Sequence, residues 1–146
     1  MKIKQLSVFL ENKPGQLSGP CRVLADAGIN IITMSLADTQ QFGILRLVVR
    51  EWQKARDLLE QSGCVVKTTE VLALEVPDRP GGLADVVNVL DQNSINIEYM
   101  YAFTFGRGDQ AVIVFRFEDV DAALEALRRS KVGLLDSEDL CRLSER

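Results

Sequence analysis

The stretch that decides the fold occurs twice: Asn12-Lys13-Pro14-Gly15-Gln16-Leu17 recurs as Asp78-Arg79-Pro80-Gly81-Gly82-Leu83. A second motif, Ile29-Asn30-Ile31, recurs as Ile95-Asn96-Ile97. Both motifs keep one spacing, since 78 − 12 and 96 − 30 each give 66 residues. Two motifs in a single register indicate an internal repeat of two structural units, and such a repeat predicts two related sites.

Hydrophobic periodicity predicts the same order of elements in each repeat. The first repeat is expected to contain strands at 5–10, 29–37, 44–50 and 64–68, with one helix ending before Gly28 and another at 52–61. The second is expected to contain strands at 72–76, 95–103, 111–117 and 132–135, with helices to about Gln92 and from Val120. Residues 136–146 fit either a short helix or an edge strand.

Each repeat therefore reads β-α-β-β-α-β. This order predicts an α+β chain of two tandem ferredoxin-like domains, each with an antiparallel sheet and both helices on one face. We expect the domains at residues 1–70 and 71–146, with the boundary near Glu70. No Gly- or Ser-rich linker separates the repeats, so we expect them to be held closely rather than tethered loosely.

The first helix differs between the repeats, because Pro20 stands where the second repeat has Val86. A helix that began at Gln16 would lose a main-chain hydrogen bond at Pro20, so we expect it to begin near Ser18 instead. That start moves the free amides away from Gly15. By this criterion the second repeat is predicted to be the slightly better site for a carboxylate.

The apolar side chains of the second strand change face between the repeats. Ile32, Met34 and Leu36 lie on one face of the first-repeat strand, whereas the apolar weight of the second-repeat strand lies on the opposite face, with Tyr99 and Tyr101. A sheet covered on one side only would keep the same face apolar. We therefore expect a further interface on the sheet face or edge, either between the repeats or in a homodimer.

Composition excludes several classes of function. The chain of 146 residues has a net charge of −4, which argues against nucleic-acid binding, and no apolar run of the roughly 18–20 residues that a membrane span needs. Its amino terminus lacks a signal-like apolar segment, so we expect a cytoplasmic protein. It contains no histidine, no nucleophile beside a base and no metal-spaced cluster. We therefore expect no catalytic residues, no metal and no cofactor.

The paired motifs, [Asn/Asp]-[Lys/Arg]-Pro-Gly-x-Leu before the first helix and Ile-Asn-Ile at the second strand, resemble those of the ACT domain family. The resemblance covers nearly the whole chain twice and is closest to stand-alone proteins made of two tandem ACT domains. It implies the β-α-β-β-α-β fold and the binding of free amino acids by a regulatory module. In this family the pocket usually forms where the first-helix turn faces a neighbouring domain's sheet edge.

The motif also suits a small zwitterion on physical grounds. Gly81 and Gly82 let the backbone approach a ligand, and the amides of this turn lie at a helix amino terminus, which favours a carboxylate. The Asp78 carboxylate can accept hydrogen bonds from the ammonium group, whereas Asn12 offers only a neutral amide oxygen. The two sites should therefore differ in their affinity for the same ligand. Ordinary turn and helix-capping chemistry explains the same residues without a ligand, and it is the family resemblance that favours a binding site.

The function predicted is a non-enzymatic sensor that binds a free amino acid at ACT domain interfaces and regulates amino-acid metabolism, as a homodimer. The alternative is a regulatory subunit that docks onto a separate metabolic enzyme through its open sheet face. We expect Asn30 and Asn96 to lie close to the motif turn. The candidate ligand-binding residues are Asn12, Lys13, Pro14, Gly15, Gln16, Leu17, Asn30, Ile31, Asp78, Arg79, Pro80, Gly81, Gly82, Leu83, Asn96, Ile97 and Tyr99.

Overall fold

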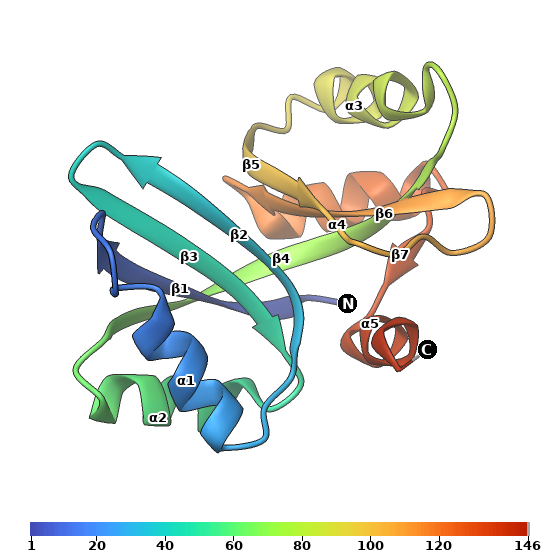
Figure 1. Ribbon diagram of the computed structural model, residues 1–146. Coiled ribbons are helices and arrows are strands. Elements are labelled where there is room, and N and C mark those ends of the chain that lie inside the picture. Colours follow the sequence, from blue (N-terminus) through green and yellow to red (C-terminus); the bar gives the residue numbers. More distant parts are fainter. Residues whose placement is uncertain (146) are drawn as a thin grey trace. The chain divides into compact units, whose positions relative to one another are not determined.

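The computed structural model describes residues 1–145. By packing, the chain divides into two compact units (Figure 1). One comprises Lys4–Thr69 and holds the first repeat. The other runs from Glu70 onward, includes Met1–Ile3 and holds the second repeat. Each unit is described by itself below.

The first unit has the predicted ferredoxin-like plan. Its elements are β1 (Ile3–Glu11), α1 (Ser18–Asp26), β2 (Ile31–Thr39), β3 (Phe42–Val49), α2 (Trp52–Gln61) and the start of β4 (Val65–Pro77). The strands lie in the order β2-β3-β1-β4, and α1 and α2 pack side by side (Figure 1). Leu6, Val8, Leu45, Leu47 and Leu59 are almost fully buried and form the centre of its core.

The second unit repeats the plan and adds a helix. The rest of β4 is followed by α3 (Gly82–Gln92), β5 (Ile97–Ala102), β6 (Gln110–Phe117), α4 (Val120–Arg129), β7 (Leu134–Leu135) and α5 (Ser137–Ser144). The strands lie in the order β7-β4-β6-β5. Phe115 and Phe117 stack with ring centroids 5.6 Å apart inside this core. At the amino terminus, Lys2 Nζ lies 2.7 Å from Asp121 Oδ1 of α4, and this hydrogen bond raises the Lys2 pKa.

Residues 136–145, which the sequence left open between helix and strand, form helix α5 from Ser137. Asp136 and Asp139 make a capping box, each side chain accepting from the other's backbone amide. Leu140 and Cys141 are buried where α5 packs beside β7 (Figure 1). The alternative of a continued edge strand is therefore wrong.

Strand register fixes the faces that the sequence compared. Leu36 pairs with Leu45 and Met34 with Leu47, so the side chains of Met34 and Leu36 both lie on the helix-covered face. Met100 pairs with Phe115 on the matching face of the second unit. Met34 and Leu36 nevertheless remain 56% and 57% exposed, because β2 is the edge strand.

Candidate functional site

Helix α1 begins at Ser18 and places Pro20 in its first turn, as predicted. Gly15 adopts φ 89° and Gly81 adopts φ 86°, a conformation that explains glycine at this position of both motifs. Among the described residues, no acceptor faces the backbone amides of Leu17, Ser18 and Gly19. The turn therefore offers free donors at a helix amino terminus, where negative charge is favoured.

Gln16 and Gly82 hold equivalent positions, 66 residues apart, yet they give the two helices different starts. Helix α3 already includes Gly82, and a Cβ atom there would lie 1.9 Å from the Pro77 carbonyl oxygen. The second-repeat helix thus rests directly on the end of β4. Gln16 cannot approach its strand so closely, because its side chain requires that space. The first-repeat turn is accordingly two residues longer before its helix begins.

Beside this turn lies a cavity of about 200 Å³, which we call the motif pocket. It is lined by Leu10, Glu11, Asn12, Lys13, Gln16, Leu17, Leu36, Ala37, Asp38 and Gly43. Four of the six residues of the first motif thus face one cavity. The volume lies below the roughly 300–1,000 Å³ of drug-sized sites, so it suits a ligand of amino-acid size.

The floor of the motif pocket follows from strand register. Gly43 of β3 pairs with Leu10 of β1 on one side and with Asp38 of β2 on the other. Neighbouring strands lie about 4.8 Å apart, so Leu10 and Asp38 flank a slot about 10 Å wide over Gly43. A glycine at the centre of this row leaves the slot open.

Charged groups of both signs surround the slot. Lys13 Nζ lies 2.9 Å from Glu11 Oε2, and both side chains are more than half exposed. Asp38 is exposed, and within residues 1–145 its carboxylate has no hydrogen-bond or ion-pair partner. The Asn12 side chain instead binds the turn between β2 and β3, because its Nδ2 donates to the Gln40 carbonyl at 3.0 Å.

Among the residues that line the motif pocket, sequence reasoning missed Leu10, Glu11, Leu36, Ala37 and Asp38. They lie outside both repeated motifs, on β1 and β2, and only the pairing of β3 with both of these strands brings them to one slot. The sequence pointed to Gly43 only as part of Phe42-Gly43, a pair that could help close a pocket. A glycine in a strand often marks a close approach to a ligand or backbone.

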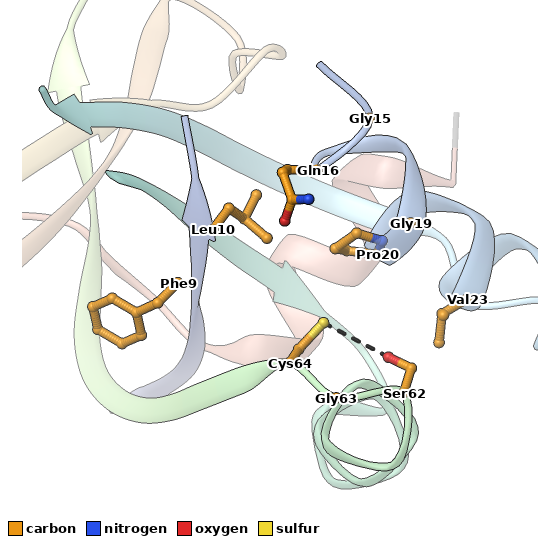
Figure 2. Close-up of a pocket in the computed structure, with 10 residues that line it drawn as sticks. All are labelled: Phe9, Leu10, Gly15, Gln16, Gly19, Pro20, Val23, Ser62, Gly63 and Cys64. Atoms are coloured by element: carbon orange, nitrogen blue, oxygen red, sulfur yellow. Dashed lines mark hydrogen bonds between the residues drawn. The ribbon is translucent and has the colours of Figure 1, made fainter. Parts of the chain in front are cut away.

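A second cavity, which we call the strand-end pocket, lies on the other side of Gln16. It measures about 300 Å³ and is lined only by uncharged residues: Phe9, Leu10, Gly15, Gln16, Gly19, Pro20, Val23, Ser62, Gly63 and Cys64. Figure 2 shows the Gln16 carboxamide pointing from the turn into the space between Leu10 and Pro20, opposite the Ser62–Cys64 contact of 3.6 Å.

The strand-end pocket has an equivalent in the second unit. A cavity of about 270 Å³ there is lined by Glu75, Val86 and Val89, which stand 66 residues after Phe9, Pro20 and Val23. This cavity carries charges, from Glu75, Asp85 and Lys131. Because the hollow recurs with unrelated linings, we attribute it to the fold rather than to one ligand.

The second motif is built differently from the first. Arg79 Nη2 lies 3.2 Å from Asp85 Oδ2, and the Asp78 amide donates to the Asp109 carbonyl. Strand β5 ends at Ala102, which pairs with Ile113, so no β5 residue lies opposite Ala111, the partner of Val76. Thr104 stands where the first repeat has Asp38. The second unit therefore lacks the third strand of the slot.

The remaining predicted residues lie elsewhere. Ile31 pairs with Val49 at the opposite end of β2 from Asp38, and Ile97 likewise pairs with Phe117 at the far end of β5. The expectation that Asn30 and Asn96 lie close to the turn of their own repeat is thus wrong. The helix carries the chain to the other end of the sheet before the second strand begins. Tyr99 pairs with Arg116 in the middle of β5.

Within residues 1–145, no cluster of three or more His, Cys, Asp or Glu side chains is placed to hold a metal ion. None of the helices in that range has the length and apolar character needed to cross a bilayer.

The βαββαβ plan, repeated around a turn of free amides, defines a pair of small regulatory modules of the ACT type. The chain matches the family model described as "ACT domain pair" over residues 1–144 and belongs to that family. No curated protein matches it.

Solved structures agree with this assignment. Protein BT0572 from Bacteroides thetaiotaomicron is 39% identical with a TM-score of 0.89, and 96% of each chain is covered. The ligand-free regulatory subunit of aspartate kinase from Thermus thermophilus is 16% identical with a TM-score of 0.61, covering 87% of this chain and 91% of that one. The subunit from Thermus flavus is 18% identical with a TM-score of 0.59, covering 88% and 92%. At these identities the two Thermus proteins show the fold alone.

Proposed function

We propose that this protein is a non-enzymatic sensor of a free amino acid, acting in the cytoplasm to regulate amino-acid metabolism. The observation that carries the proposal is the motif pocket, whose lining combines the unpaired Asp38 carboxylate, the Lys13 ammonium group and Leu17, whose backbone amide is unpaired. A zwitterion needs an acceptor for its ammonium group and donors for its carboxylate. The slot offers both without a nucleophile or a metal.

We place the site in the first repeat. From the position of Pro20 alone, the sequence predicted that the second repeat is the slightly better site for a carboxylate. Two features outweigh it: the first repeat has the longer turn, and its β2 carries Asp38 to the edge of the slot. Because this slot has one unpaired carboxylate, Asp38, and one floor glycine, Gly43, we expect one ligand for each chain.

Isothermal titration calorimetry of the purified full chain against the proteinogenic amino acids tests this function. We expect saturable binding of at least one of them at a molar ratio of one per chain. Absence of heat for every amino acid at millimolar concentration would overturn the proposal.

The homodimer is also part of the proposal. Edge strand β2 leaves Met34 and Leu36 more than half exposed, and apolar side chains on a free strand edge favour association. The same exposed edge supports the alternative of a regulatory subunit docked on a separate metabolic enzyme. Purification from the native cell distinguishes them, since a free sensor elutes without a second protein.

A further inference from the structure

We infer that the amino acid bound in the motif pocket is one with an aliphatic side chain of leucine size. This inference rests on the proposed function and adds the chemical class of the ligand. It follows from what each side of the slot can contact.

The ammonium end is set by Asp38. Its carboxylate is exposed and has no ion-pair or hydrogen-bond partner among the described residues, whereas Glu11 is already paired with Lys13. Hydrogen bonds that involve a charged partner are roughly twice as strong as neutral ones. Asp38 is therefore the group that receives the ligand ammonium.

The carboxylate end is set by the opposite side of the pocket. The amide of Leu17 has no acceptor within residues 1–145 and is the free donor here, while Lys13, although paired with Glu11, adds positive charge. Both belong to the turn that leads into α1, where the helix dipole adds a further preference for an anion. The ligand thus lies across the slot, with its two charges on opposite walls.

Leu10, Leu17, Leu36 and Ala37 supply the apolar surface of the cavity, beside the polar side chains of Asn12 and Gln16. Leu17 and Leu36 are 40% and 57% exposed. Each buried CH₂ group is worth about 0.8 kcal/mol, so an aliphatic ligand side chain gains by covering them. A charged or hydroxylated side chain would lose hydration against these four residues and find no partner among their side chains.

The second repeat has different residues at the positions equivalent to those of the motif pocket. Ala102 replaces Leu36, Thr104 replaces Asp38 and Gly82 replaces Gln16, each 66 residues on. The second unit keeps the motif leucine as Leu83, the basic residue as Arg79 and an apolar residue, Val76, in place of Leu10, but it has neither the Asp38 carboxylate nor the Leu36 side chain. We therefore expect the preference for an aliphatic amino acid in the first repeat alone.

Calorimetry with ligands that each lack one feature tests the inference. We expect L-leucine to bind at least tenfold more tightly than L-alanine, and more tightly than L-aspartate, L-lysine or L-threonine. Asp38→Asn should weaken L-leucine at least tenfold and leave 4-methylpentanoate, which lacks the ammonium group, within about twofold.

Leu36→Ala introduces the residue that the second repeat has at this position, Ala102. It should bring the affinities for L-leucine and L-alanine to within about threefold of each other. Ala102→Leu is its matched control and should change neither affinity. Asp38 and Leu36 are both exposed, so the variants should fold, which thermal melting verifies.

Three outcomes contradict the inference in different ways. Preferential binding of a charged or hydroxylated amino acid would overturn the ligand class and leave the sensor function standing. Equal loss of L-leucine and 4-methylpentanoate in Asp38→Asn would overturn the assignment of the ammonium contact. No binding of any amino acid would remove the proposed function together with this inference.

Discussion

Gln16 and Gly82 show how one side chain separates two copies of a motif. Gly82 lets α3 rest on the Pro77 carbonyl, which a Cβ atom would approach to 1.9 Å. Gln16 keeps the first-repeat turn off its strand and lines both cavities of the first unit. The sequence analysis attributed the different helix starts of the two repeats to Pro20. The difference between Gln16 and Gly82 also affects where each helix begins.

Gly82→Ala should destabilise the protein by about 1–3 kcal/mol, because the added methyl group overlaps backbone that cannot move freely. Urea unfolding followed by circular dichroism measures the loss. Gly19→Ala is the matched control: its Cβ would meet nothing within 4 Å, so it should leave stability unchanged or raise it slightly. Equal effects of the two substitutions would contradict the close packing of α3 on β4.

At the scale of elements, the length of the second strand decides where a site can form. Strand β2 runs to Thr39 and reaches Asp38, whereas β5 ends at Ala102, three positions earlier in register. The sequence predicted both strands and the order of the flanking helices. It could not predict which strand would continue past the row of Gly43, because that depends on pairing with β3 rather than on local propensity.

Helix α5 depends on the capping box at its amino terminus. The Asp139 amide donates to Asp136 Oδ1 at 2.8 Å, and this hydrogen bond holds the Asp136 pKa below its ordinary value of 3.8. A carboxylate with a lowered folded-state pKa stabilises the fold fully above its unfolded-state pKa. The stabilisation is lost as the pH falls through the lowered value.

Amide exchange protection in α5 should therefore fall as the pH drops from about 5 to about 2, relative to α2, whose amino-terminal cap has no side-chain hydrogen bond. Asp136→Asn keeps an acceptor oxygen without an ionisable group, so it should flatten this difference. A similar pH response of α5 in the original chain and in Asp136→Asn would contradict the role of Asp136.

At the scale of the whole chain, the repeat predicted the family, the fold class and the order of the elements of both units. It could not predict that the two units would differ at the site. Asp38 and Gly43 lie outside both repeated motifs, and only the pairing of β1, β3 and β2 brings them to one slot. It also misplaced Asn30, because α1 returns the chain to the end of the sheet where β1 begins, so β2 starts away from the motif turn. Duplication of the fold is thus a poor guide to duplication of the site.

We propose that each chain binds one amino acid, in the first repeat. Amide chemical shifts of the full, isotope-labelled chain, recorded while L-leucine is added, test both the place and the number of the sites. We expect the amide shifts to change at residues 11–13, 15–18, 36–38 and 43, and to saturate at one ligand per chain. Changes of similar size at residues 78, 79 and 81–84, or saturation at two ligands per chain, would contradict a single first-repeat site.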